Sequence, residues 1–389
     1  MSNIYAVLGS GMQGTAAAYD LALFGEPSRI LMADSFLHQS RKSAEKVNNL
    51  LGKDICIPVQ VDVLEPESLK KFLEEVDVVL SCVPYWMHPL VAVAAIYSKT
   101  NMVDLGGNTD ISLQTLSYHE EALATGVTVI PDTGLAPGLV VSLASASIEY
   151  FDQTEAIKIY CGGLPQHPKP PFNYKLVFNI EGLLTEYMGK ATVLREGEIQ
   201  QIDTLSELEI LHIDSLGEME AFVTSGGTST APYSWKDCLL NFEYKTIRHP
   251  GHCVLMKIFK DYGFWGTEPI ETHSGEIKPI DLFMKLMGET LKDPHDTDLV
   301  VVQCLANGIK KGVREQLQID IVHRYAQETN FSAMEQLTGF STSICAIEIA
   351  KGHIKKGCVR YEKAMSGEHF VEELQKRGIQ VKQQISKLI

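Results

Sequence analysis

The first third of the chain alternates short aliphatic runs with longer stretches that have a helical pattern. Nearly continuous aliphatic runs are typical of parallel strands that are buried on both faces of a sheet. The pattern predicts strands at Ile4–Leu8, Arg29–Ala33, Ile55–Val63, Val76–Val83, Met102–Leu105 and Val127–Pro131, with helices at Thr15–Phe24, Arg41–Leu51 and Pro66–Glu75. This strand–helix alternation predicts an α/β fold built on a doubly wound parallel sheet, the Rossmann arrangement.

After about residue 151 the strands become longer, and polar and apolar residues alternate along them. One hairpin is expected to turn at 195–198, and a second at Asn307 and Gly308, between strands at 300–305 and 316–325. This second pattern predicts an α+β domain with a mixed, mostly antiparallel sheet and helices on one side. The chain becomes helical again from Ala333 onward. We therefore predict a Rossmann domain at 1–138, an α+β substrate and dimerisation domain at 139–335, and C-terminal helices at 336–389 that return to the Rossmann domain.

Composition narrows the class of protein. The chain has 34 Lys and Arg residues against 49 Asp and Glu residues, a formal net charge of −15, which repels nucleic-acid backbones and anionic lipid. Its apolar runs are shorter than the roughly 20 residues of a membrane helix, and the N-terminal run lacks the basic region of a signal peptide. The eight cysteines are scattered singly, which suits reduced thiols. We expect a cytoplasmic protein that binds neither nucleic acid nor a membrane.

A glycine-rich motif follows the first predicted strand and opens the first predicted helix. It has the GxGxxG spacing and consists of Gly9, Ser10, Gly11, Met12, Gln13 and Gly14. In this context the first glycine permits a tight turn, the second lets the backbone approach a pyrophosphate, and the third lets helix and strand pack closely. The free N–H groups of the helix N-terminus then stabilise the phosphates. The motif predicts a dinucleotide cofactor.

Residues at the ends of the next strands suggest which dinucleotide is bound. Asp34 ends the second strand, where a carboxylate accepts hydrogen bonds from ribose hydroxyls and repels a 2′-phosphate, so NAD is favoured over NADP. Arg41 and Lys42 lie nearby and could soften this preference. Asp62 ends the third strand and is a candidate for a contact near the adenine, with a solvated strand-end acid as the alternative. The last candidate cofactor contacts follow the fourth strand and are Cys82, Val83 and Pro84.

A second binding surface is predicted on one strand of the α+β domain. Side chains at every second position of a strand share a face, so Tyr244, Thr246 and Arg248 should point the same way. Two hydroxyls and a guanidinium fork suit an amino-acid α-carboxylate, which arginine can bind with two parallel hydrogen bonds. An ordinary exposed strand face is the alternative interpretation.

Six short sequence motifs occur together between residues 132 and 252. They are DTGLAPG (132–138), CGGLP (161–165), PPFNYK (170–175), NIEG (179–182), AFVTSGG (221–227) and YKTIRHPGH (244–252). With the glycine motif, they resemble the saccharopine reductase and lysine 6-dehydrogenase family over nearly the whole chain. In the glutamate-forming saccharopine reductases an arginine stands where this chain has Glu181, and an Asn-Arg-Asp type segment stands at 226–229 (GGTS). A buried glutamate would repel a substrate carboxylate but would complement an amine, so the resemblance favours the lysine 6-dehydrogenase branch.

Three residues are candidates for accepting the proton of the substrate ammonium. Lys175 and Glu181 lie in phrases that the family shares, and Asp132 follows the sixth strand at the edge of the sheet where ligands bind. The sequence does not choose among them. His249 and His252 lack a clear third ligand, so we predict no metal site.

These observations predict NAD-dependent oxidative deamination of the ε-amine of L-lysine, or of a similar basic amino acid, to a semialdehyde through an imine. The nearest alternative is a saccharopine reductase or dehydrogenase, or a related carboxy-polyamine dehydrogenase. A more distant alternative is a non-catalytic NAD-binding sensor. Because strand-rich domains leave sheet edges to cover, we also expect a homodimer or homotetramer.

Overall fold

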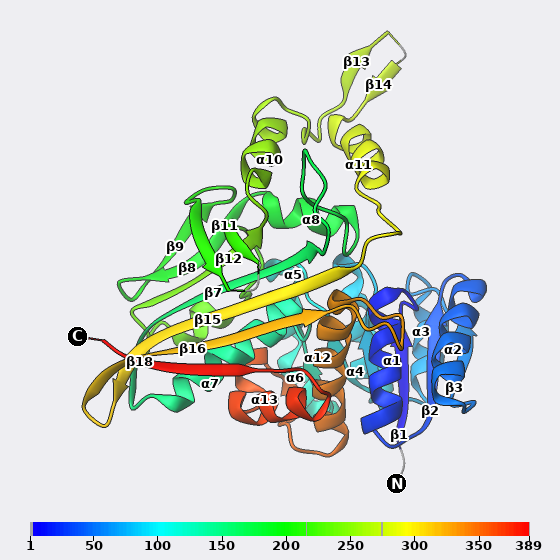
Figure 1. Cartoon of the computed structure of the whole chain (residues 1–389). Coiled ribbons are helices and arrows are strands. Elements are labelled where there is room, and N and C mark those ends of the chain that lie inside the picture. The colour runs from blue at the N-terminus through cyan, green and yellow to red at the C-terminus, as the bar shows by residue number, and fades with distance from the viewer. Residues whose placement is uncertain (1–2, 215, 274, 389) are drawn as a thin grey trace.

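The computed structural model describes residues 3–214, 216–273 and 275–388, which form two sheets with helices around and between them (Figure 1). The first sheet is parallel throughout, with strand order β17-β6-β5-β4-β1-β2-β3. Its strands are β1 (Asn3–Leu8), β2 (Pro27–Asp34), β3 (Cys56–Gln60), β4 (Val78–Ser81), β5 (Asn101–Asp104), β6 (Thr128–Ile130) and β17 (Gly357–Cys358). The predicted doubly wound α/β fold is confirmed.

Helices cover both faces of this sheet, which explains why its central strands are almost wholly aliphatic. Alternate side chains of β1 and β4 point to opposite faces: Val7 and Leu80 pack toward α1 and α12, whereas Ala6 and Val79 pack toward α3 and α4. The helices of this part of the chain are α1 (Met12–Phe24), α2 (Leu37–Leu51), α3 (Pro66–Leu73), α4 (His88–Ser98), α5 (Thr109–Leu116) and α6 (His119–Thr125), with a short 3₁₀ turn η1 (Tyr85–Met87).

The second sheet has nine strands and is mostly antiparallel, as the alternating pattern predicts. Among the strand pairs of this sheet that the structure describes, β12 with β7 is the one parallel pair. Its strands are β7 (Gln153–Pro165), β8 (Lys190–Arg195), β9 (Glu198–Asp203), β10 (Glu209–Ile213), β11 (Gly217–Val223), β12 (Asn241–Arg248), β15 (Asp298–Lys310), β16 (Val313–Arg324) and β18 (Lys382–Lys387).

Two helices, α7 (Val140–Tyr150) and α12 (Ala333–Ala350), join the sheets into one apolar core. Ile344 and Ala346 of α12 belong to the same buried cluster as Val103 of the first sheet and Ile319 of the second. Nearly every residue of α12 is buried, because the helix packs against α1 on one side and against β15 on the other. Further helical elements are η2 (Leu135–Leu139), α8 (Ile180–Tyr187), α9 (Ala231–Trp235), η3 (Tyr361–Lys363) and α13 (Gly367–Lys376).

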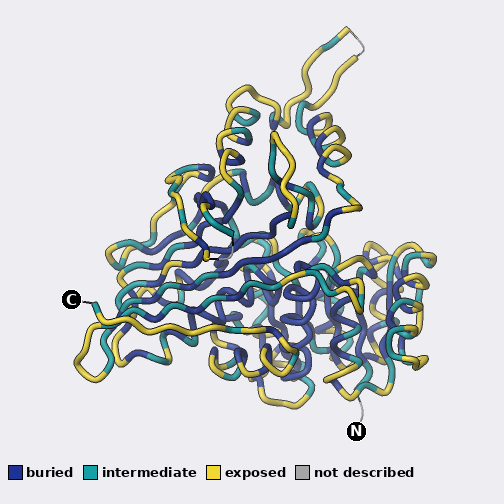
Figure 2. The backbone as a smooth tube through the Cα atoms, viewed as in Figure 1, coloured by how far each residue is buried: buried dark blue, intermediate teal, exposed yellow. Residues whose placement is uncertain are grey.

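A helical extension projects from the second sheet (Figures 1 and 2). It comprises α10 (His252–Asp261), α11 (Pro279–Thr290) and a small exposed hairpin of β13 (Ile270–Thr272) and β14 (Gly275–Ile277). Tyr187 of α8 and Phe283 of α11 pack against Trp265, which lies in the segment after α10, and all three belong to one buried cluster. This aromatic cluster supports the strand that carries Arg248.

One of the two predicted hairpin turns is confirmed, and the other lies four residues further along the chain. The turn at 195–198 is confirmed, with Glu196 and Gly197 between β8 and β9. The second turn lies at Lys311 and Gly312 instead of at Asn307 and Gly308, which belong to β15. A Cβ on Gly308 would lie 2.6 Å from the Gln153 carbonyl oxygen, so close packing rather than a turn requires glycine there.

The C-terminal segment contributes to both sheets: β17 joins the parallel sheet, and β18 pairs with β16. The exact domain limits and the oligomeric state stay predictions. In the described parts of the chain, no helix is both long and apolar enough to cross a membrane.

Candidate active site

The glycine motif forms a tight turn at the carboxyl end of β1, where the packing requires two of its glycines. Gly9 has φ +93°, and a Cβ there would lie 2.5 Å from the Cys82 carbonyl oxygen. A Cβ on Gly14 would lie 2.2 Å from the Gly9 carbonyl oxygen. A Cβ on Gly11, in contrast, would meet nothing within 4 Å, and no side chain caps the N-terminus of α1 at this residue. The turn therefore leaves open space and free backbone N–H groups where a pyrophosphate is expected.

Asp34 stands at the end of β2, beside this turn. Its carboxylate accepts hydrogen bonds from the backbone N–H groups of Ser10 and Phe36, both at 3.0 Å. These contacts fix the carboxylate next to the glycine motif, where it can meet a ribose. Asp62 is exposed beyond β3 and accepts from the N–H of Leu64 at 2.9 Å. The remaining candidate cofactor residues, Cys82, Val83 and Pro84, follow β4 at the same edge.

A pocket lies between the glycine turn and the second sheet. Its walls come from the start of α1, the segments after β5 and β6, strands β7 and β12, and helices α8 and α12. The lining residues are Gln13, Leu105, Leu135, Ala136, Cys161, Gly162, Gly163, Phe178, Glu186, Tyr244, Thr246, Arg248, Met334 and Thr338. The pocket thus brings Gln13 of the glycine motif together with the three residues predicted on β12.

Gln13 offers a hydrogen-bond acceptor to a ligand in this pocket. Its side-chain oxygen Oε1 is buried and accepts no hydrogen bond from any described residue. An unpartnered buried amide oxygen is costly unless a ligand supplies a donor. Because Gln13 belongs to both the glycine turn and the pocket, this residue fits a dinucleotide that extends from the turn into the pocket.

Tyr244, Thr246 and Arg248 share one face of β12 and line the pocket, as their spacing predicts. The Arg248 guanidinium is buried: Nε donates to the Tyr187 hydroxyl at 2.9 Å, and Nη1 donates to the Ile247 carbonyl at 3.0 Å. Nη2 lies 3.4 Å from Oε2 of Glu186. With three of five N–H groups assigned among the described residues, two donors are left for a ligand.

A hydrogen-bond chain behind Arg248 fixes its orientation. The Tyr187 hydroxyl accepts from Arg248, so it donates to Nε2 of His252, which lies at 3.0 Å. Burial lowers the pKa of His252 to about 3, so its ring is neutral and its Nδ1–H donates to the Phe172 carbonyl at 3.3 Å. His252 therefore packs behind the pocket and, through Tyr187, holds the orientation of Arg248.

Glu186 is a pocket residue that the sequence analysis missed. It lies on α8, lines the pocket, and is the residue that pairs with Arg248. Burial raises the pKa of its carboxyl to about 7, although the charge of Arg248 opposes this shift. A signal for it exists in the sequence: Glu186 lies three residues after Leu183 and one before Tyr187, so it borders the buried side of a short amphipathic helix.

None of the three predicted proton acceptors is among the residues that line the pocket. Lys175 lines a separate cavity, where its ammonium donates to the Asp296 carbonyl. Glu181 is exposed in the first turn of α8. Glu181 and Glu186 are five positions apart, which turns the two side chains about 140° apart around the helix. The interpretation that Glu181 faces the substrate amine is therefore corrected: Glu186 occupies the position next to Arg248.

Asp132 lies at the junction of the two domains. Its Oδ1 accepts from the Ser112 hydroxyl at 2.7 Å, and its Oδ2 accepts from the Ser229 hydroxyl, which belongs to the second domain, at 2.5 Å. Burial and the nearby charge of Asp104 raise the pKa of Asp132 to about 7. The segment that follows it supplies Leu135 and Ala136 to the pocket wall. A carboxyl of this pKa is partly ionised at neutral pH and can accept a proton.

This shift makes stability depend on pH. In the unfolded chain the Asp132 carboxyl has a pKa near 4, so the folded state holds the proton more tightly between pH 4 and 7. Its contribution to the free energy of unfolding is present below about pH 4 and is lost as pH rises through 7. Asp132→Asn should flatten this decline by an amount on the order of 3 kcal/mol. Urea unfolding of both proteins at pH 4.5 and 7.5 tests this, and parallel changes in the two would contradict it.

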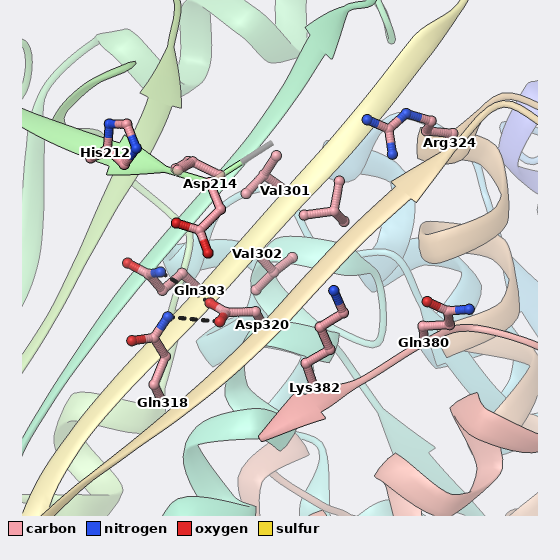
Figure 3. A pocket seen from close by; sticks show the side chains of 12 residues that line it. His212, Asp214, Val301, Val302, Gln303, Gln318, Asp320, Arg324, Gln380 and Lys382 are labelled. Atoms are coloured by element: carbon pink, nitrogen blue, oxygen red, sulfur yellow. Dashed lines mark hydrogen bonds between the residues drawn. The ribbon is translucent and has the colours of Figure 1, made fainter. Parts of the chain in front are cut away.

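Two other polar clusters are distinct from this pocket. A hollow on the outer face of the second sheet contains Gln303 and Gln318, whose amides donate to Asp320 at 3.0 and 2.7 Å (Figure 3). It includes none of the predicted site residues. The carboxylates of Glu348 and Glu373 lie near His369, but Lys351 and Lys376 already neutralise them at 2.9 and 2.6 Å. This second cluster is a network of ion pairs.

Comparisons with known proteins agree with this geometry. A segment of 152 residues, 37% of this chain, is 34% identical to mouse mitochondrial alpha-aminoadipic semialdehyde synthase and covers 16% of that protein. A match of the same length, 38% of this chain, is 30% identical to the NADP(+), L-glutamate-forming saccharopine dehydrogenase of Saccharomyces cerevisiae and covers 33% of it. The chain thus matches about a third or less of each of these relatives.

The fold also has a solved counterpart. The structure of apo saccharopine dehydrogenase (L-Glu forming) from Saccharomyces cerevisiae aligns with 99% of this chain and 100% of its own, at a TM-score of 0.80 and 20% identity. The model of the saccharopine dehydrogenase NADP binding domain matches residues 5–130, and that of the saccharopine dehydrogenase C-terminal domain matches residues 134–379. The chain therefore belongs to the saccharopine dehydrogenase family.

Proposed function

We propose that this protein is an NAD-dependent amine dehydrogenase that oxidises the ε-amine of L-lysine, or the terminal amine of a similar basic amino acid. The amine becomes an imine, and water converts the imine to the semialdehyde and ammonia. One observation carries the proposal: a buried arginine with two free donors stands in a largely apolar pocket that also contains Gln13 of the dinucleotide motif. Such a pocket suits an aliphatic chain with a carboxylate at one end.

The cofactor would be held by the residues of the glycine turn. Backbone N–H groups at the start of α1 face the pyrophosphate, Asp34 takes the ribose hydroxyls, and Gln13 meets the nicotinamide end. When bound, the nicotinamide accepts a hydride from the carbon that bears the amine. Asp34 favours NAD, although the matched domain model and the yeast relative carry NADP in their names.

Residues of the chain itself then bind the substrate carboxylate, exclude water and accept a proton. Arg248 holds the substrate α-carboxylate, since its fork suits two parallel hydrogen bonds. Leu135, Ala136 and Met334 line the pocket with apolar groups that exclude water from the reacting carbon. Asp132 is the candidate proton acceptor: it is buried at the domain junction, just before the segment that supplies Leu135 and Ala136 to the wall, and its pKa of about 7 suits removal of a proton from the substrate ammonium.

Saccharopine oxidation is the second candidate function, because relatives of this chain carry that name. It would require a site for the glutamate half of the substrate. The segment at 226–229 stands where the glutamate-forming pattern has an arginine, but it is closely packed: a Cβ on Gly227 would lie 2.4 Å from the Tyr244 ring. This packing favours the smaller amine substrate.

A substrate panel distinguishes the two functions. Purified protein is expected to reduce NAD with L-lysine and to release one ammonia for each NADH, with kcat/KM at least about tenfold higher than with NADP. Nicotinamide reduction is followed at 340 nm with L-lysine, L-saccharopine, L-ornithine and cadaverine, each with both cofactors. Turnover of saccharopine with release of glutamate, and none of lysine, would replace the first proposal by the second.

A further inference from the structure

We infer that Glu186 binds the α-ammonium group of the substrate, so that Arg248 and Glu186 together recognise the zwitterionic head of an α-amino acid. This inference rests on the proposed function, which assigns the α-carboxylate to Arg248. It adds a specificity-determining residue and restricts the substrates to α-amino acids, as opposed to simple amines and ω-amino acids.

The first observation is the charge of the pocket. Among the described residues that line it, Arg248 is the only cation and Glu186 is the only carboxylate. The remaining lining residues are uncharged, and the neutral His252 lies behind Arg248. A zwitterion therefore enters without adding net charge to a buried site. A ligand with a carboxylate alone would place two negative charges beside one arginine, which is costly away from water.

The second observation is that Glu186 has unused hydrogen-bonding capacity. Its Oε2 lies 3.4 Å from Arg248, longer than the roughly 2.7–2.9 Å that is usual for charged pairs, and its Oε1 accepts from no described residue. The Glu186 side chain is 30% exposed, whereas that of Arg248 is 3% exposed. The carboxylate is thus open to the pocket and can accept the N–H groups of an ammonium.

The third observation is the position of the pair. In an α-amino acid one carbon carries both charged groups, so their binding partners must be adjacent, as Arg248 and Glu186 are. Tyr187 follows Glu186 directly on α8 and accepts a hydrogen bond from Arg248 at 2.9 Å, which fixes the spacing between helix and strand. The apolar residues Leu135, Ala136 and Met334 form other parts of the wall and suit the aliphatic part of the substrate.

Binding measurements test this role without relying on turnover. Calorimetry with the NADH-loaded protein, which cannot oxidise the ligand, compares L-lysine with 6-aminohexanoate, which lacks only the α-amine. Glu186→Gln should weaken L-lysine binding about 30-fold, whereas 6-aminohexanoate binding should stay the same or become tighter, because the variant removes a negative charge beside the ligand carboxylate. Glu198→Gln, the same change at an exposed position of β9, serves as the matched control. Glu186→Asp should restore part of the affinity for L-lysine.

Two ligand comparisons keep the inference testable if Glu186→Gln folds poorly. The wild-type protein should bind L-lysine at least about 30-fold more tightly than either 6-aminohexanoate or Nα-acetyl-L-lysine. Equal affinity for the three ligands, equal losses for both ligands in Glu186→Gln, or no binding of L-lysine would overturn the inference. L-lysine binding that depends on Glu186 but gives no NADH would instead refute the proposed function and leave the head-group assignment intact.

Discussion

Alanine in place of Gly14 is expected to lower the free energy of unfolding by about 2 kcal/mol and to abolish dinucleotide binding. The new Cβ would lie 2.2 Å from the Gly9 carbonyl oxygen and 2.8 Å from Val7, so helix α1 must move away from β1. Overpacking of this kind costs about 3 kcal/mol, and the higher helix propensity of alanine returns about 1 kcal/mol. Urea unfolding and titration with NADH, followed by fluorescence, measure the two effects.

Gly11→Ala is the matched control, because the same methyl group is added three residues away. Its Cβ meets nothing within 4 Å and its φ is −79°, so the free energy of unfolding should change by less than about 1 kcal/mol. The methyl group enters the space expected for the pyrophosphate, and NADH binding should therefore weaken about tenfold or more. Full NADH affinity in Gly11→Ala would place the cofactor elsewhere.

Arg248→Met is expected to lower kcat/KM for L-lysine by roughly 10²–10³, through loss of the charged hydrogen bonds to the α-carboxylate. The substitution also leaves Glu186 without its partner. Because the pKa of Glu186 is already about 7, this carboxyl can take up a proton, so the loss of stability should stay below about 3 kcal/mol. Initial rates of NADH formation and urea unfolding of the same preparation separate the two consequences.

Cadaverine provides the control for Arg248→Met, since it has the terminal amine but no carboxylate. Its slow turnover should be the same within about threefold in the wild-type protein and in the variant. The double variant Arg248→Met/Glu186→Gln should regain part of the stability and none of the activity toward L-lysine. A variant that loses activity toward cadaverine and L-lysine alike would show that Arg248 supports the fold of the pocket without binding the carboxylate.

Local patterns in the sequence account for the architecture. The run at 76–83 indicates a strand buried on both faces because helices pack against both sides of β4, and the period-two pattern of β12 places Tyr244, Thr246 and Arg248 on one face. The predicted turn at Asn307 and Gly308 is wrong because glycine occurs for two different reasons. It suits the backbone of a turn, but at 308 it permits close contact with the neighbouring strand. A single sequence does not separate these causes.

The choice of candidate residues shows a similar limit. The motifs that contain Glu181 and Lys175 predict both residues at the site, but a sequence motif does not specify which side of a helix or loop faces a pocket. Glu186 acquires its position from the contact between α8 and the end of β12. Likewise, the contact between Asp132 and Ser229 joins residues 97 positions apart, which no local spacing reveals.

The sequence by itself determined the parallel sheet, the dinucleotide turn and the shared face of Tyr244, Thr246 and Arg248, because each depends on neighbours within a few positions. Only the tertiary structure decided which charged groups meet in the pocket. It paired Arg248 with Glu186, exposed Glu181, and buried Asp132 where its pKa rises to about 7. The physical reason is that charge pairing and burial are set by long-range packing of helices on sheets, whereas strand and turn patterns are set by local backbone geometry.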